Sequence, residues 1–420
     1  MATIPVSADE LRATPEPVVP AAAPAAVAPP PGHPRFPLVD SLRAIAALGV
    51  LLYHVSFVSN TAIGGLLSHG DAGVALFFSI SGFLLYRPFV SARLNGARRP
   101  TVGAYMRRRL LRIIPAYWLA LTVLAIHPGL SGVFTSHFWV YYGFLQNYNP
   151  FFTFGGIPPA WTLCIEITFY LALPLYAVAV AGMLRGRGPR WQVALELGVI
   201  LGLAALSLAY RYALRSEHSN SSLLIALPTY VDWFAPGLAL AVLSAAAQGG
   251  LLPPAVHAVA RRPAALAAAG LGVYLIACLV LRVQVIFTYL GAGQDVYRHI
   301  LYALASGLLL SAVIVSRPGR LGRLFGWRPL AWLGLISYGI YLWHDPLLNW
   351  ICQPTPSAGC HMHGVGLLNS NQLLGLAVPD MVLAVTCAAA SYYIVERPIL
   401  RFKDGRRARR TVPAAAEVAR

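Results

Sequence analysis

The stretch LVDSLRAIAALGVLLYHVSF, residues 38–57, has the length and apolar composition of a helix that crosses a membrane. It nevertheless carries Asp40, Arg43 and His54, and ionisable groups inside a bilayer are costly and therefore candidates for function. Arg43 and His54 lie 11 residues apart, which puts them on one helix face, about 16 Å apart along the axis. The structural alternative is an arginine that extends to the membrane surface and a histidine that hydrogen-bonds another helix.

The overall composition assigns the rest of the chain to a membrane as well. Of its 420 residues 57% are hydrophobic and 11% charged, with a mean hydropathy of +0.63, whereas soluble domains usually have about 25% charged residues. Apolar runs of about 17 to 25 residues can each span a bilayer as a helix. We therefore predict an all-α polytopic membrane protein with about ten helices, near 38–58, 72–90, 110–127, 160–182, 192–210, 223–245, 264–286, 297–315, 330–351 and 374–395.

The basic residues predict the orientation of these helices. The formal net charge of +17 could suggest a nucleic-acid partner, but 28 of the 32 Lys and Arg residues fall on the termini and on alternate loops. By the positive-inside rule, this asymmetry places both termini in the cytoplasm and indicates a multi-pass plasma-membrane protein, not one that binds nucleic acid. Only Arg211, Arg215, Arg282 and Arg298 remain for the opposite side.

The chain divides into a central region and two tails. Residues 1–36 are rich in Pro and Ala without periodicity, and we expect a disordered cytoplasmic tail that stays attached because it lacks signal-peptide features. Residues 37–397 form the predicted membrane domain, and 398–420 a basic cytoplasmic tail. The five cysteines have no metal-ligand spacing, so we expect no metal site, and only Cys352 and Cys360 are a candidate disulfide pair. We also expect no permanently bound cofactor.

A second polar position lies in PPAWTLCIEITFYLALPLY, residues 158–176, where Glu166 is the only acid. This predicted helix runs inward, so Glu166 is expected near the depth of His54. A carboxylate that pairs with an imidazole fixes its tautomer and raises the basicity of its other nitrogen. We therefore predict a hydrogen bond between His54 and Glu166, with a purely structural ion pair as the alternative.

Two further segments add candidate residues. RRPTVGAYMRRRLLRIIPAYW, residues 98–118, clusters Arg107, Arg108, Arg109 and Arg112, which either set topology or bind phosphate groups. LISYGIYLWHDPLLNW, residues 335–350, places His344 next to an aspartate, near the predicted depth of His54. Membrane-interface packing explains its aromatic residues, but not its histidine.

These stretches occur in an order that resembles a known family. FPLVDSLRAIAALGVLLYHVSF, GVALFFSISGFLLYRPF, YMRRRLLRIIPAYW, WTLCIEITFYLALPLY, SYGIYLWHDP and SYYIVERPILRF follow one another between residues 36 and 403. Together they resemble the acyltransferase-3 family of integral membrane O-acyltransferases. The resemblance implies ten membrane helices and transfer of an acyl group, usually acetyl, from cytoplasmic acyl-CoA to a hydroxyl of a sugar, glycolipid or secondary metabolite.

The resemblance also implies roles for individual residues. The catalytic pair falls on His54 and Glu166, and the acyl-CoA contacts on Arg43, Arg108, Arg109 and Arg112. We add His344, Tyr338, Trp161 and Ser81 from the same motifs as candidate substrate contacts.

The chain departs from the family pattern in two motifs. Ala75 stands where many members have an aspartate, and Ile167 and Thr168 replace a Glu-Gln pair. These differences leave Glu166 as the only acid of its helix and weaken any inference about the acceptor.

The expected mechanism joins two levels of the membrane. Arginines at the cytoplasmic side would hold the CoA phosphates, and a protein-lined passage would bring the pantetheine arm to His54. His54 would act either as a general base or as an acyl carrier. A transporter that uses the intramembrane Arg, His and Glu as a substrate path is the alternative function, and a structural membrane scaffold is another.

Overall fold

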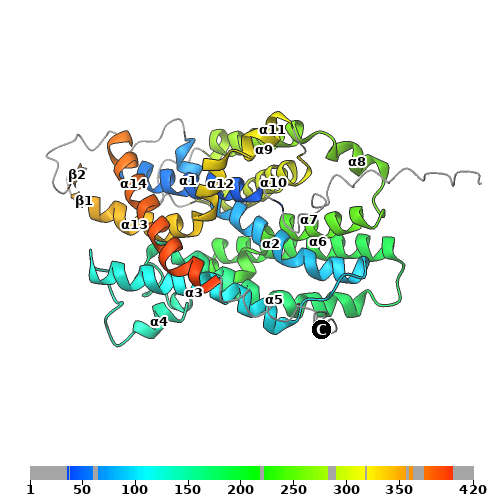
Figure 1. Cartoon of the computed structure of the whole chain (residues 1–420), viewed down its shortest axis with the longest axis horizontal. Coiled ribbons are helices and arrows are strands. Elements are labelled where there is room, and N and C mark those ends of the chain that lie inside the picture. The colour runs from blue at the N-terminus through cyan, green and yellow to red at the C-terminus, as the bar shows by residue number, and fades with distance from the viewer. Residues whose placement is uncertain are drawn as a thin grey trace, which may run out of the picture.

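The computed structural model describes residues 36, 38–59, 65–217, 222–281, 290–316, 319–355, 359–362 and 373–400. Within them the chain is predominantly helical, and Figure 1 shows most helices running along the long axis of the molecule. The α-helices are α1 (Val39–Val58), α2 (Ala72–Leu94), α3 (Val102–Ile126), α4 (Phe138–Tyr142), α5 (Trp161–Met183), α6 (Pro189–Ser216), α7 (Val231–Gln248), α8 (Pro254–Ala260), α9 (Pro263–Leu281), α10 (Ala292–Val315), α11 (Arg320–Phe325), α12 (Arg328–Leu335), α13 (Ser337–Ile351) and α14 (Leu373–Ser391).

Short elements connect these helices. Two strands, β1 (Cys352–Thr355) and β2 (Gly359–Met362), form an antiparallel hairpin after α13. It lies with α4 at one end of the molecule, and α8 lies toward the other (Figure 1). Single helical turns occur at η2 (Leu67–His69), η3 (Gln146–Tyr148), η4 (Pro158–Ala160), η5 (Ser222–Ile225), η6 (Leu227–Thr229) and the π-helical η7 (Tyr392–Glu396).

The membrane-spanning helices agree with the predicted pattern except at one position. In the described part of the chain, nine helices are long and apolar enough to cross a bilayer. The expected span at 330–351 is instead divided into α12 and α13, which meet at Ile336, whose φ of −96° and ψ of 6° interrupt the helix. The chain is thus an all-α polytopic membrane protein, and the predicted continuous helix at 330–351 is wrong.

Glycines allow close helix contacts in the core. A Cβ on Gly237 of α7 would lie 1.8 Å from the carbonyl oxygen of Ser79 in α2, and one on Gly334 of α12 would lie 1.7 Å from that of Asp40 in α1. Any larger residue would therefore separate these backbones. The second contact positions the α12–α13 break beside α1, which carries His54.

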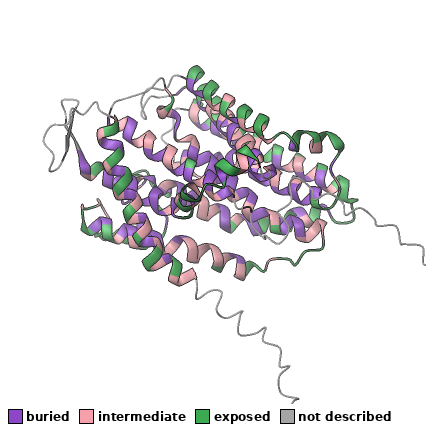
Figure 2. Cartoon of the chain, turned by 45° about the horizontal axis from the view of Figure 1, so that its top comes forward, coloured by how far each residue is buried: buried purple, intermediate pink, exposed green. Residues whose placement is uncertain are grey.

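The outer helices have the surface that a bilayer requires. Large apolar side chains of α6 and α9 are exposed, including Leu201, Leu206, Leu279 and Val280. Figure 2 shows buried positions along the inside of the bundle and exposed ones on its periphery. Lipid replaces water around such a surface, so its exposure is favourable in a membrane.

Some sequence-based predictions concern the chain ends and the cysteines. The predicted disordered and basic tails at 1–36 and 398–420 lie almost entirely outside the described residues. Cys352 is disulfide-bonded, as expected for one member of the candidate pair, whereas Cys164, Cys278 and Cys387 are free.

Candidate active site

His54 of α1 contacts His344 of α13. The Nδ1 atom of His54 lies 3.2 Å from Nε2 of His344, and the two rings are 4.9 Å apart between centroids. His344 is fully buried. Its own Nδ1 donates to the carbonyl oxygen of Ile340 at 3.1 Å, so in the neutral ring Nε2 is an acceptor that faces His54.

The surroundings of His54 define its tautomer by the same reasoning. Its Nδ1 lies 2.9 Å from the carbonyl oxygen of Val50. Because a carbonyl only accepts hydrogen bonds, Nδ1 carries the proton and is shared between Val50 and His344. The Nε2 atom of neutral His54 therefore has a free lone pair, which is what a general base or a nucleophile requires.

Asp345 lies on the other side of the His54 ring. Its Oδ1 is 3.9 Å from Nε2 of His54. Asn349, one turn further along α13, donates to the backbone oxygen of Asp345 at 2.9 Å and to its Oδ2 at 3.3 Å. A carboxylate at this place stabilises His54 once Nε2 has taken up a proton.

The predicted hydrogen bond between His54 and Glu166 is wrong. Among the described residues the two share neither a hydrogen bond nor an ion pair: Glu166 accepts from Ser81 at 2.7 Å and from Tyr170, whereas His54 contacts His344 and Asp345. The physical reason is that counting residues from a helix end gives depth but not direction. Glu166 faces α2, and the carboxylate next to His54 comes from α13.

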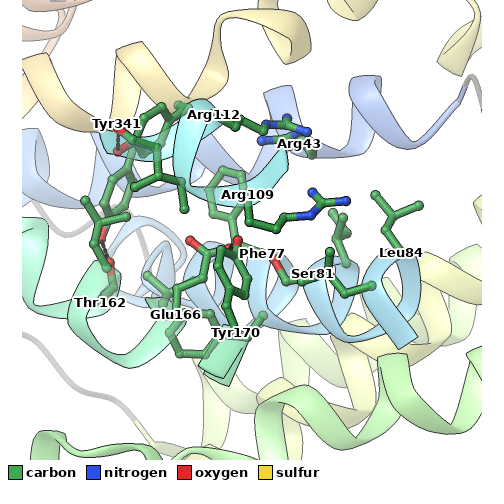
Figure 3. A pocket seen from close by; sticks show the side chains of 17 residues that line it. Arg43, Phe77, Ser81, Leu84, Arg109, Arg112, Thr162, Glu166, Tyr170 and Tyr341 are labelled. Atoms are coloured by element: carbon green, nitrogen blue, oxygen red, sulfur yellow. Dashed lines mark hydrogen bonds between the residues drawn. The ribbon is translucent and has the colours of Figure 1, made fainter. Parts of the chain in front are cut away.

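Glu166 belongs to a basic cavity that we call the arginine cavity. Its lining includes Arg43 of α1, Arg109 and Arg112 of α3, and Ser81 of α2. In the view of Figure 3, Arg43 and Arg109 lie on one side of Glu166, with Thr162 and Tyr341 on the other. Its cationic side chains can bind phosphate groups.

The remaining candidates of the basic motif and of α13 are placed differently. Arg108, the neighbour of Arg109, is half-buried but is not among the residues that line the arginine cavity. Tyr338 lines it, and its hydroxyl donates to the carbonyl oxygen of Ile113 in α3 at 3.1 Å. The motif therefore contributes Arg109 and Arg112, one helical turn apart, but not Arg108.

A second, larger cavity of about 440 Å³ contains the histidine, and we call it the His54 cavity. Its lining includes His54, Asp345 and Asn349, together with Trp161 at the start of α5. His344 supports His54 from behind and is itself fully buried. The cavity thus combines an imidazole, a carboxylate and an amide with a large aromatic side chain.

The two cavities meet at Val74 and Tyr341, which line both. The Tyr341 hydroxyl donates to the Pro159 carbonyl oxygen at 3.0 Å and lies 2.8 Å from the Thr162 hydroxyl, and its ring packs against Phe77 at 6.0 Å. The structure therefore has two adjoining cavities with a shared wall, and not the continuous passage that the sequence predicts.

Sequence reasoning missed part of the His54 cavity. Asp71 and Arg298 line it, but the sequence pattern marks Arg298 only as a charge of the outer side and does not mark Asp71. The only available signal was that each lies at the start of an apolar segment, on the same predicted side as His54. That pattern alone does not distinguish a site residue from an ordinary helix-end charge.

Taken together, the fold and the two adjoining cavities define a polytopic membrane protein with ionisable side chains facing cavities inside its helix bundle. The family model described as an acyltransferase domain matches residues 37–392. The chain therefore belongs to the acyltransferase-3 family.

Curated proteins that are similar to this chain are named as O-acetyltransferases. The chain is 26% identical to the peptidoglycan O-acetyltransferase OatA of Listeria monocytogenes over 334 residues, which is 74% of this chain and 49% of the relative. It is 24% identical to the O-acetyltransferase OatA of Staphylococcus aureus over 387 residues, 87% of this chain and 57% of the relative. YrhL of Bacillus subtilis is 26% identical over 388 residues, 87% and 55% of the two chains.

The matches cover only part of each relative. The chain spans about half the length of the curated relatives it matches. No solved structure matches it.

Proposed function

We propose that this protein is a plasma-membrane O-acyltransferase that moves an acyl group, acetyl in the first instance, from cytoplasmic acyl-CoA to a hydroxyl of an acceptor. The observation that carries the proposal is the His54–His344 contact, which leaves a basic nitrogen in the wall of one cavity while a second, arginine-lined cavity adjoins it. The family membership and the O-acetyltransferase names of the relatives support the same class of reaction.

The arginine cavity is the proposed donor site. Arg43, Arg109 and Arg112 would bind the CoA phosphates through charge-assisted hydrogen bonds. The basic loops predict that this side faces the cytoplasm, where acyl-CoA is available. The pantetheine arm would then extend between Val74 and Tyr341 toward His54, so these two residues would have to separate for the thioester to arrive.

In the direct route, Nε2 of His54 accepts the proton of the acceptor hydroxyl while the oxygen of that hydroxyl attacks the thioester carbonyl. The carbon–sulfur bond then breaks, and the proton on His54 passes to the leaving thiolate, so that CoA leaves as the thiol. Asp345 stabilises the imidazolium between these two steps, 3.9 Å away. In the covalent route, Nε2 attacks the thioester carbonyl and the carbon–sulfur bond breaks, which releases the CoA thiolate and leaves the acyl group on the imidazole. The acceptor oxygen then attacks this acyl group, the carbon–nitrogen bond breaks, and the hydroxyl proton goes to the released thiolate.

Glu166 has a different proposed role from the one expected. Its bonds to Ser81 and Tyr170 fix its carboxylate in the arginine cavity. There its negative charge, in the same cavity as the arginines, would help to orient the donor. Glu166 is accordingly a positioning residue for the donor, and Asp345 acts on His54.

The proposed acceptor is a hydroxyl-bearing glycan or glycolipid. The names of two relatives support this class of acceptor, because both relatives are named O-acetyltransferases and one is named for peptidoglycan. The acceptor would enter the His54 cavity, which the predicted topology places toward the outer face.

The proposal is tested with sealed inverted vesicles that contain the protein, radiolabelled acetyl-CoA outside and a cell-envelope glycan extract inside. We expect labelled ester in the lumen from the wild type and none from His54→Ala. Label that crosses the membrane without forming an ester would indicate a transporter. The absence of any ester with wild-type protein, on either side, would contradict the acyltransferase.

A further inference from the structure

One wall of the His54 cavity carries an ion pair that the proposed chemistry does not use. Asp71, at the start of α2, and Arg298, near the start of α10, both line the cavity. The Oδ2 atom of Asp71 lies 3.6 Å from a terminal nitrogen of Arg298, and the two side chains are 19% and 20% exposed. The pair is therefore accessible from the cavity but sheltered from bulk solvent.

Buried partners hold each member of this pair in position. The Tyr302 hydroxyl donates to Oδ1 of Asp71 at 2.7 Å and lies 2.7 Å from Nδ1 of His69. The other terminal nitrogen of Arg298 donates to Oδ1 of Asp295 at 2.9 Å, and Asp295 is fully buried. The pair is thus preorganised, which lowers the entropic cost of binding a ligand.

The distance between Asp71 and Arg298 is longer than those of the hydrogen bonds to the buried Asp295. Asp295 accepts from Nε of Arg211 at 2.6 Å and from Nε of Arg215 at 3.1 Å, whereas 3.6 Å between Asp71 and Arg298 exceeds an ordinary hydrogen bond. Oδ2 of Asp71 can therefore accept, and the facing nitrogen of Arg298 can donate, a bond with a ligand. Two neighbouring hydroxyls fit such a pair, because one donates while the other accepts.

An aromatic wall adjoins the ion pair. Trp161, Tyr230 and Trp233 line the same cavity. Their rings form a continuous series, with 5.5 Å between the centroids of Trp161 and Tyr230 and 4.9 Å between those of Tyr230 and Trp233. Arg211 lies over the Tyr230 ring at 5.1 Å and supports it from the buried side. Such rings pack against flat apolar surfaces, including the C–H face of a pyranose.

We propose that Asp71 and Arg298 form a binding site for a vicinal diol, as carried by a pyranose ring whose apolar face packs against the aromatic wall. This inference deepens the proposed function, because it assigns the recognition of the acceptor to named residues of the His54 cavity. One hydroxyl donates to Asp71, its neighbour accepts from Arg298, and a further hydroxyl of the same ring is presented to His54.

The site is tested by binding, independently of acyl transfer. The probes are methyl pyranosides of glucose, galactose, mannose, rhamnose and N-acetylglucosamine, with cyclohexanol as a ring that lacks a diol. Their dissociation constants are measured by saturation-transfer NMR on the full chain in nanodiscs free of sugar detergent and without acyl-CoA. We expect at least one pyranoside to bind more tightly than cyclohexanol.

Two variants and one matched control locate the binding. Asp71→Asn and Arg298→Gln should each weaken the pyranoside by about tenfold or more, the usual effect of losing a hydrogen bond to a charged group. Cyclohexanol binding and acyl-CoA affinity should stay unchanged. Arg215→Gln removes a charge from the same network through Asp295, but Arg215 is not among the cavity-lining residues, so the pyranoside should bind it as it binds the wild type.

The possible failures are distinguishable. If no pyranoside binds more tightly than cyclohexanol, or if Arg215→Gln weakens binding as much as the other two variants, the diol site is wrong, whether or not vesicles transfer acetyl groups. If pyranosides bind through Asp71 and Arg298 but no ester ever forms, the diol site stands and the acyltransferase proposal fails. Unchanged acyl-CoA affinity shows in each variant that the protein is folded.

Discussion

Nε2 of His344 lies 3.2 Å from Nδ1 of His54, and Oδ1 of Asp345, the next residue of α13, lies 3.9 Å from Nε2 of the same ring. Two consecutive residues of one helix thus contact opposite nitrogens of the same imidazole. This arrangement requires α13 to run directly beside α1 (Figure 1). Under the proposed mechanism, His344 orients His54, Asp345 stabilises its positive charge, and His54 transfers the proton.

Variants of the two histidines should distinguish the proposed base, His54, from the residue that orients it, His344. His54→Ala should reduce acyl transfer by about 100-fold or more, since general-base catalysis typically contributes that much. His344→Gln, whose amide can still contact Nδ1, should reduce it less than His344→Ala. Initial rates in membranes with matched protein amounts check this order. Wild-type turnover by His54→Ala would contradict the catalytic assignment.

Asp345→Asn should lower the transfer rate by about tenfold or more, because the amide no longer stabilises protonated His54. The KM for acyl-CoA should not change, since Asp345 lines the His54 cavity and not the arginine cavity. Steady-state kinetics distinguish the two parameters. Glu196→Gln, on a buried acid of the bundle that pairs with Arg93 and lies outside both cavities, is the matched control, and equal losses in both variants would indicate a structural role only.

Glu166→Gln should change the binding of the acyl-CoA donor. The amide keeps an acceptor for Ser81 and Tyr170 but loses the charge. We therefore expect a changed KM for acyl-CoA with acceptor binding unaffected, whereas a His54–Glu166 catalytic pair would lower kcat and leave the donor KM unchanged. Comparing both kinetic constants between Glu166→Gln and Asp345→Asn decides which carboxylate serves His54.

Neutralising Arg109 and Arg112 together should weaken acyl-CoA binding by about tenfold or more, with the loss largest at low salt because screening already weakens phosphate contacts at high salt. The matched control is Arg107→Gln with Arg108→Gln, which removes the same charge from the same helix outside the cavity. Equal losses in both pairs would favour a topology signal over a donor site, and protease protection of the loops reports that topology directly.

The shared wall at Val74 predicts a steric effect. Val74→Phe should slow acyl transfer while acyl-CoA still binds the arginine cavity, because the larger side chain narrows the connection to His54. Val74→Ala enlarges the same place and should not slow it by this route. Size-exclusion profiles of both variants control for misfolding. Wild-type rates in Val74→Phe would show that the thioester does not pass this wall.

The candidate site was only partly predictable. His54, His344 and Glu166 were all recognised as unusual polar residues in apolar segments, and each lines or supports one of the two cavities. Their pairing was not predictable, because a residue's distance from a helix end says nothing about the direction in which its side chain points. Arg108 and Arg109 are equivalent in sequence, yet only Arg109 lines the arginine cavity.

The sequence by itself determined the membrane class, the approximate position of almost every spanning helix and a few of the intramembrane ionisable residues, among them Arg43, His54 and Glu166. These properties depend on local composition, since apolar length and the expense of buried charge are read residue by residue. The tertiary structure alone decided the break at Ile336, the assignment of Asp345 rather than Glu166 to His54, and the meeting of Asp71 with Arg298. These depend on how helices rotate and pack at a few close contacts such as Gly334 against Asp40, and no local pattern specifies that rotation.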